Sequence, residues 1–323
     1  MKLRLQIGLL ILFGLLFSIQ AWAYPQYYCT AACKDYYDRV LNLIGSIHRH
    51  NFDNVIEIAV FDLGLNSNQI EILQKIAKVH VYSSIREDYP SLLNRYIPPD
   101  ASSHFGWQWK PGWYAWKPIA IHEVLQKFPY VLWLDAGCTI QRSLDNLFRY
   151  IDQDGYFLAT IGDDLFSDRF IIDDEGNQHL APIHPLGLGT TQFVKEQFDL
   201  ENPQNAWMLD QEFVMATLLG VAKRSELLFL NEWHALTQDI RNFADDGTTP
   251  DGWGTARHDQ TLLSILALRN NLKIFPLDSV QGTAINLDLQ GDKHPLYMAW
   301  RSGLIGKNTH IIIRSVVNYW SLD

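Results

Sequence analysis

A strand, a helix and a second strand follow one another directly near the start of this chain, an order that few folds accommodate. Residues 54–61 are an apolar, β-branched run that ends at Asp62. Asn66 then offers an N-cap for a stretch with apolar residues at helical spacing, and residues 79–82 form another short apolar run. This succession predicts a right-handed βαβ unit with parallel strands.

The same alternation continues along the chain. A helix is expected from Pro118 to Lys127, followed by a strand over 130–134 that ends at Asp135. Since parallel strands present their carboxyl ends at one edge of a sheet, Asp62 and Asp135 should face the same crevice. The sequence therefore predicts an α/β fold, with a mostly parallel, Rossmann-like central sheet flanked by helices.

The remaining segments are assigned by the same rules. A helix is expected over 37–48, strands over 156–161 and 272–275, and an apolar helix over 261–268 that has Asp259 at its N-terminal end. No internal repeat and no long linker divides the chain. We therefore expect a single domain with its core at about 54–275 and a C-terminal tail at 276–323.

The first 23 residues have the pattern of a signal peptide. Lys2 and Arg4 precede an apolar run over 7–19, and Ala21-Trp22-Ala23 follows it. We expect cleavage after Ala23, which leaves a domain of residues 24–323; an uncleaved signal anchor stays open. The protein should then be exported, to a periplasm, the medium or a secretory lumen, with membrane contact only through an uncleaved signal segment.

Charge and cysteine content exclude several classes of protein. The formal net charge is -10, and no run of Lys or Arg is longer than a dipeptide, so a nucleic-acid partner is not expected. Three cysteines are too few for a disulfide scaffold. Cys29 and Cys33 either close a small loop or stay unpaired, and Cys138 is expected to be a core thiol.

Motifs for hydrolytic and zinc chemistry are missing. The chain has neither a G-x-S-x-G elbow nor an H-E-x-x-H pair. The acidic stretch over 163–176 does not have the spacing of a calcium loop, so a surface hairpin is expected there more than a metal site.

Aromatic residues are unusually frequent, with 11 Trp and 14 Tyr. Trp107, Trp109 and Trp113 stand in a Gly- and Pro-rich segment, where three tryptophans are seldom all buried. An exposed aromatic loop suits stacking against sugar rings, so these residues are expected to bind an acceptor sugar.

Four motifs in order carry a family resemblance. They are Asp62-Leu63-Gly64-Leu65, then Trp116-Lys117-Pro118 ahead of Val131–Gly137, then Asn231-Glu232-Trp233, and Arg257-His258-Asp259-Gln260 before an apolar helix. Together they resemble the GT-A-type (nucleotide-diphospho-sugar) glycosyltransferase superfamily, and a poorly characterised GT-A-like group of animals and bacteria. The resemblance covers about residues 54–275. It implies a GT-A fold and a glycosyltransferase that moves a sugar from a nucleotide-diphosphate donor to a glycan or glycoconjugate acceptor.

The resemblance also implies a donor site. Its expected residues are Asp62, Trp116, Lys117, Asp135, Gly137 and Lys293. Such enzymes usually neutralise the diphosphate with Mn²⁺ or Mg²⁺ held by a D-x-D motif, which here reads Asp135-Ala136-Gly137. Either Asp135 and a distant ligand such as His294 hold the metal, or a cation of the protein replaces it. His294 is alternatively an ordinary surface histidine, and Trp116 a core residue.

On the acceptor side Asp259 is the catalytic candidate. A carboxylate at a helix start stays ionised, and it can take a proton from the acceptor hydroxyl or orient the acceptor sugar; it can also serve simply as a cap. His258 is the neighbouring candidate for acceptor binding, and only one of the two should face the cleft.

A different class of function stays open. Nucleotide sugars are not expected outside a cell, so an exported chain could instead be a carbohydrate-binding or glycan-hydrolysing protein without nucleotide-sugar activity. Nucleotide affinity distinguishes the two.

Overall fold

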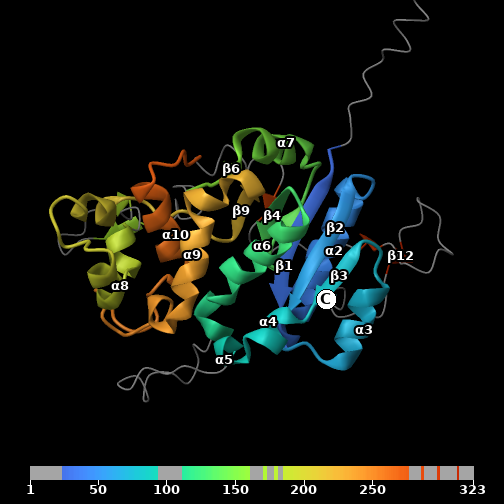
Figure 1. Cartoon of the computed structure of the whole chain (residues 1–323), viewed down its shortest axis with the longest axis horizontal. Coiled ribbons are helices and arrows are strands. Elements are labelled where there is room, and N and C mark those ends of the chain that lie inside the picture. Colours follow the sequence, from blue (N-terminus) through green and yellow to red (C-terminus); the bar gives the residue numbers. More distant parts are fainter. Residues whose placement is uncertain are drawn as a thin grey trace, which may run out of the picture.

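A six-stranded sheet organises the protein, with strand order β3-β2-β1-β4-β9-β6 (Figure 1). The computed structural model describes residues 24–93, 111–160 and 185–275, together with short strand segments at 170–172, 178–180, 285–286, 297–298 and 311–312. The parallel strands are β1 (Gln26–Ala32), β2 (Val55–Asp62), β3 (Val79–Tyr82) and β4 (Tyr130–Leu134). Strand β9 (Leu218–Ala222) pairs antiparallel with both β4 and β6 (Tyr156–Phe157). The α/β class with a mostly parallel sheet is confirmed.

Strand β1 lies at the centre of the sheet, although the sequence pattern did not indicate it. It reads Gln-Tyr-Tyr-Cys-Thr-Ala-Ala and pairs with β2 on one side and β4 on the other. Small and polar residues weaken its strand signal, and burial between two neighbours compensates for them. The predicted core therefore begins too late, at Asn54 instead of Gln26.

Local capping signals mark the ends of several helices. Asn66 and Gln69 make a reciprocal capping box at the start of α3, and Gly155 ends α7 with φ of 94°. The helices are α2 (Tyr37–Asn51), α3 (Ser67–Lys75), α4 (Ser84–Asp88), α5 (Pro90–Leu93), α6 (Trp116–Lys127), α7 (Asp145–Asp154), α8 (Gln192–Gln197), α9 (Leu230–Ala235) and α10 (His258–Arg269).

Helices cover both faces of the sheet, and the alternation of side chains along each strand separates two cores. Val131 and Trp133 of β4 belong to the core under α4, α6, α9 and α10. Leu132 and Leu134 belong to the core under α2, α3 and α7. The result is three layers, helix, sheet and helix, as a parallel sheet buried on both faces requires (Figure 1).

The order of the strands reverses at β1. The chain runs from β1 through α2 to β2 and through α3 to β3, and then returns across β1 through α6 to β4. In open α/β sheets, ligands bind outside the carboxyl ends of the strands at such a reversal. The edge of the sheet at the carboxyl ends of β1 and β4 is therefore the expected position of a ligand site.

The second half of the chain departs from the expected strands at two places. Strand β6 covers only Tyr156–Phe157 of the expected strand over 156–161. Residues 272–275 add no strand to the main sheet, since only Phe275 forms an isolated bridge, to Ala159. Strands β7 (Phe170–Ile172) and β8 (Gln178–Leu180) pair antiparallel. This pairing is the hairpin expected within the acidic stretch. Further two-residue strands are β5 (Thr139–Ile140), β10 (Ile285–Asn286), β11 (Tyr297–Met298) and β12 (Ile311–Ile312).

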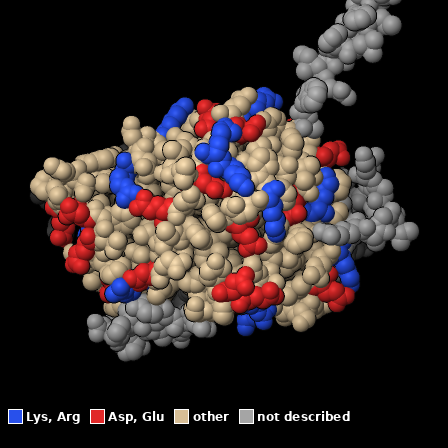
Figure 2. Space-filling model, viewed as in Figure 1, with Lys and Arg blue, Asp and Glu red and all other residues tan. Residues whose placement is uncertain are grey.

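The cysteines are unpaired, and charges of both signs are mixed on the surface drawn in Figure 2. Cys29, Cys33 and Cys138 are all free thiols, so the small disulfide loop is not formed. In the face drawn in Figure 2, basic and acidic side chains are interspersed and form no continuous basic stripe. Among the described residues, no helix has both the length and the apolar character needed to cross a bilayer.

Candidate active site

The side chain of Lys117 joins two carboxylates that lie far apart in the sequence. Its Nζ lies 3.1 Å from Oδ1 of Asp135, which follows β4, and 2.6 Å from Oδ2 of Asp259, in the first turn of α10. The ammonium also donates to the carbonyl oxygen of Ala216 at 3.1 Å. We call Lys117, Asp135 and Asp259 the Lys117 triad. It lies at the carboxyl end of β4, beside the reversal of strand order.

The three members of the triad differ in exposure. The side chain of Lys117 is 3% exposed and that of Asp259 is 7% exposed, whereas Asp135 is 34% exposed. Asp135 Oδ1 also accepts a hydrogen bond of 2.8 Å from Nε1 of Trp133. Asp135 is therefore the most exposed member of the triad, and Lys117 and Asp259 are more deeply buried.

The charges of the triad stabilise one another. Burial lowers the pKa of Lys117, but the charges of Asp135 and Asp259 and their hydrogen bonds outweigh burial and raise it above its ordinary value. The rings of Tyr114 and Trp133 flank the ammonium, with centroids 5.5 and 5.4 Å from Nζ. Lys117 is therefore a permanent cation inside the protein.

Gly137 faces open space. No heavy atom outside its immediate neighbours lies within 4 Å of the position that a Cβ would take there. The fold itself does not need glycine at this position. A side chain would instead fill space beside Asp135 that a ligand can use.

His258 and Asp259 have different partners, as expected for neighbours on a helix. Nδ1 of His258 contacts the carbonyl oxygen of Phe243 at 2.8 Å, and its ring lies 5.1 Å from that of Trp113. Both residues are buried. Only Asp259 joins Lys117.

Strained backbone gathers beside the triad. Gly112, Trp113 and Tyr114 have φ of 55°, 49° and 66°, and His258 has φ of 49°. A Cβ on Gly112 would lie 2.1 Å from the carbonyl oxygen of Leu92, so glycine is required there. Residues held in this left-handed region cluster at functional sites.

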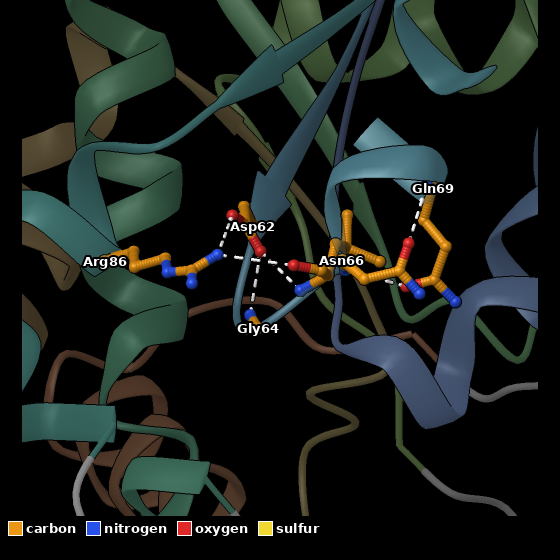
Figure 3. A network of polar contacts seen from close by, with 6 residues as sticks. Asp62, Gly64, Asn66, Gln69 and Arg86 are labelled. Carbon is orange, nitrogen blue, oxygen red and sulfur yellow. Dashed lines mark hydrogen bonds and ion pairs between the residues drawn. The ribbon is translucent and has the colours of Figure 1, made fainter. Parts of the chain in front are cut away.

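Asp62 lies apart from the triad and serves the turn after β2. One carboxylate oxygen accepts hydrogen bonds from the backbone N–H groups of Gly64 and Leu65, and the other pairs with Arg86 at 3.0 Å (Figure 3). Strand β1 separates β2 from β4. Asp62 and Asp135 do share one edge of the sheet, but the structure brings only Asp135 into the triad.

Trp113, one of the three tryptophans expected to form an exposed platform, is buried instead. Trp113 is 2% exposed and belongs to the core, and Trp116 is buried with its ring 5.8 Å from that of Trp133. Trp107 and Trp109 lie outside the described residues. The expectation that Trp113 is exposed is therefore wrong, because its ring packs inward against His258.

Two contributors were missed in the sequence. Tyr114 flanks the ammonium, and burial together with Asp259 and Asp135 raises its pKa. Ala216 contributes only its carbonyl, for which no side-chain signal exists.

The described residues do not fit a metal ion held by the protein. Asp135 and Asp259 are both engaged by Lys117, and Gly137 stands where a second carboxylate of a D-x-D motif would be. Within the described part of the chain, no group of three or more His, Cys, Asp or Glu is placed to bind a metal. Lys293 and His294 lie outside the described residues.

No family model matches the sequence. No curated protein matches it either. Solved structures of glycosyltransferases do match, as the sequence resemblance led us to expect. The chain is similar to the mannosyltransferase Ktr4p of S. cerevisiae in complex with GDP, with 10% identity and a TM-score of 0.47, over 91% of this chain and 79% of that one.

Two further structures show the same kind of similarity. Mouse xyloside xylosyltransferase 1 matches with 11% identity and a TM-score of 0.44, over 78% of this chain and 85% of that one. Core-mannan synthase A of Aspergillus fumigatus, in its Mn/GDP form, matches with 10% identity and a TM-score of 0.40, over 75% and 69%. Since these TM-scores lie below 0.5, we argue function from the side chains of this chain itself.

Proposed function

We propose that this chain is a glycosyltransferase that moves a sugar from a nucleotide-diphosphate donor to a glycan or glycoconjugate acceptor. One observation carries the proposal: Asp135 and Asp259 meet on Lys117 beside the reversal of strand order, where open α/β sheets bind ligands. A buried, charged group of this kind in a ligand-binding crevice is typical of an active site.

The donor side is assigned to Asp135 and Gly137. Asp135 keeps part of its carboxylate exposed, and the open space beside Gly137 allows a diphosphate to approach the backbone. The first turns of α6 and α10 supply Lys117 and Asp259 to the same place, so the positive ends of two helix dipoles lie near the expected diphosphate. Lys293 stays a proposed phosphate contact and Asp62 a proposed donor contact.

Asp259 is assigned to the acceptor side. In the reaction the bond from the sugar to the diphosphate breaks, the acceptor oxygen bonds to the sugar, and the acceptor hydroxyl loses its proton. The ammonium at 2.6 Å stabilises the charged form of Asp259, which suits a group that accepts a hydrogen bond from the acceptor hydroxyl and orients it. His258 links the start of α10 to the carbonyl oxygen of Phe243. Trp107 and Trp109 stay proposed acceptor contacts.

Export belongs to the proposal as well. The charged start, the apolar run over 7–19 and Ala21-Trp22-Ala23 support a signal segment. An exported enzyme of this kind needs a compartment that contains nucleotide sugars, which is a secretory lumen or the interior of another cell.

The proposal predicts nucleotide binding. We expect UDP, GDP or CMP to raise the unfolding temperature of the chain by a few degrees, because a ligand at a hundredfold excess over its Kd adds about 2.7 kcal/mol. Differential scanning fluorimetry, with each nucleotide tested in chelator and in Mn²⁺, measures this.

A substitution locates the site. Asp135→Asn should lower turnover by roughly a hundredfold or more, with its unfolding temperature near that of the unsubstituted chain. Asp154→Asn, at the exposed end of α7, is the matched control and should leave turnover unchanged. If no nucleotide binds, the glycosyltransferase proposal is replaced by the alternative of a carbohydrate-binding or glycan-hydrolysing protein.

A further inference from the structure

The ammonium of Lys117 is surrounded by oxygen atoms from three separate elements. They are a carboxylate oxygen of Asp135, a carboxylate oxygen of Asp259 and the carbonyl oxygen of Ala216, at 3.1, 2.6 and 3.1 Å from Nζ. Carboxylate and carbonyl oxygens are the ligands that Ca²⁺, Mg²⁺ and Mn²⁺ take in proteins. The ammonium therefore occupies the centre of an oxygen set that would suit a hard cation.

The three protons of the ammonium match these three acceptors. An ammonium group has three donors and no acceptor, so Lys117 has none left for a ligand. Its side chain is almost completely buried, and Tyr114 and Trp133 close two sides. Lys117 therefore has no N–H donor left for a phosphate, and its ionic partners are the two aspartates.

Charge balance follows from the same geometry. Two carboxylates without the ammonium would place two like charges around one buried space, which is strongly unfavourable. The ammonium offsets the repulsion between the two carboxylates, and the partly exposed carboxylate of Asp135 lies close in sequence to Gly137, which stands in place of a second acidic ligand.

We propose that the Lys117 ammonium is a built-in cation that stands where a divalent metal would otherwise be held, so that Asp135 and Asp259 bind no metal ion. Two consequences follow. Nucleotide binding, which rests on the proposed function, is independent of Mn²⁺, and removal of the ammonium turns the oxygen set into a metal site.

The first test uses Mn²⁺ alone and does not depend on any nucleotide. The full chain, its Lys117→Ala variant and the control Lys75→Ala, which removes an exposed lysine of α3, are titrated with Mn²⁺ and free ion is followed by electron paramagnetic resonance. We expect Lys117→Ala to gain at least about tenfold in Mn²⁺ affinity over the unsubstituted chain, because the two carboxylates then face one space with no ammonium between them. The double variant Lys117→Ala/Asp259→Asn should lose that gain.

Tight Mn²⁺ binding by the unsubstituted chain that Asp135→Asn abolishes would overturn the inference. A folded Lys117→Ala variant that binds Mn²⁺ no more tightly than the unsubstituted chain would also overturn it. If Lys117→Ala does not fold, the same titration uses Lys117→Gln, whose shorter, uncharged side chain keeps two N–H donors. Stabilisation of either variant by Mn²⁺ against thermal unfolding is the second readout.

The nucleotide arm separates the two proposals. Equal unfolding shifts in chelator and in Mn²⁺ support the built-in cation, whereas a shift that needs Mn²⁺ overturns it and leaves the glycosyltransferase proposal standing. No shift with any nucleotide removes the proposed function, while the Mn²⁺ titration still decides the role of Lys117.

Discussion

Trp113 shows how burial can reverse the meaning of a residue. Its ring is 2% exposed and lies 5.1 Å from that of His258, although its segment is rich in Gly and Pro. Its backbone is held in the left-handed region between Gly112 and Tyr114. Packing against the core offsets this strain, so Trp113 fixes the turn that leads into α6 and thereby Lys117.

Replacement of this tryptophan tests a core role. We expect Trp113→Ala to lower the free energy of unfolding by about 3–5 kcal/mol, because a large buried side chain is lost and a cavity remains. Trp207→Ala, at a position that is 46% exposed, should change it by less than about 0.5 kcal/mol. Urea denaturation measures both. Unchanged stability of Trp113→Ala, combined with weaker sugar binding, would restore the exposed platform.

Helices α6 and α9 meet through a pair of histidines. The rings of His122 and His234 stack with centroids 4.5 Å apart and planes 12° apart. Burial, and then the charge of His122, lower the pKa of His234 below its ordinary value of 6.5. Because α6 also carries Lys117, the packing of these two helices supports the position of the triad.

The histidine pair predicts a pH dependence of stability. The unfolded chain takes up the His234 proton at about its ordinary pKa, whereas the folded chain does so only at lower pH. The stability present above pH 6.5 is therefore lost progressively as the pH falls below that value.

Variants isolate this contribution. His234→Gln should reduce the slope of unfolding free energy against pH below 6.5, and His80→Gln, at an exposed histidine of β3, should leave it unchanged. Urea denaturation across a pH series measures the slopes. Equal slopes for all three proteins would show that the pair does not couple to folding.

At the scale of the molecule, the order of strands decides which residues are enclosed. Cys29 belongs to the central strand β1 and Cys138 follows β4, and both are buried, whereas Cys33 is only partly buried. Burial raises the pKa of the Cys29 and Cys138 thiols well above the ordinary value, which lowers their reactivity.

Thiol counting tests this arrangement. We expect one thiol, that of Cys33, to react with a thiol reagent in the native protein, and all three to react after unfolding in guanidinium without reductant. A mass spectrum of the labelled protein identifies the sites. Only one reactive thiol in guanidinium would mean that Cys29 and Cys33 form the disulfide that the structure lacks.

The sequence by itself determined the elements whose signals are local. Periodicity, caps and breakers within a few residues predict the βαβ unit, the strand before Asp135 and the helix behind Asp259. They also predict the helix that ends at Lys127, although it begins at Trp116 and not at Pro118. These signals also placed Asp135 and Asp259 at element ends, where site residues occur.

Only the tertiary structure decided which of these ends meet. The place of β1 at the centre of the sheet depends on pairing with two strands and not on its own composition. The partners of Lys117, the turn role of Asp62 and the burial of Trp113 depend on contacts between segments distant in sequence. Ion pairing and burial are properties of a folded environment, and no local pattern of residues encodes them.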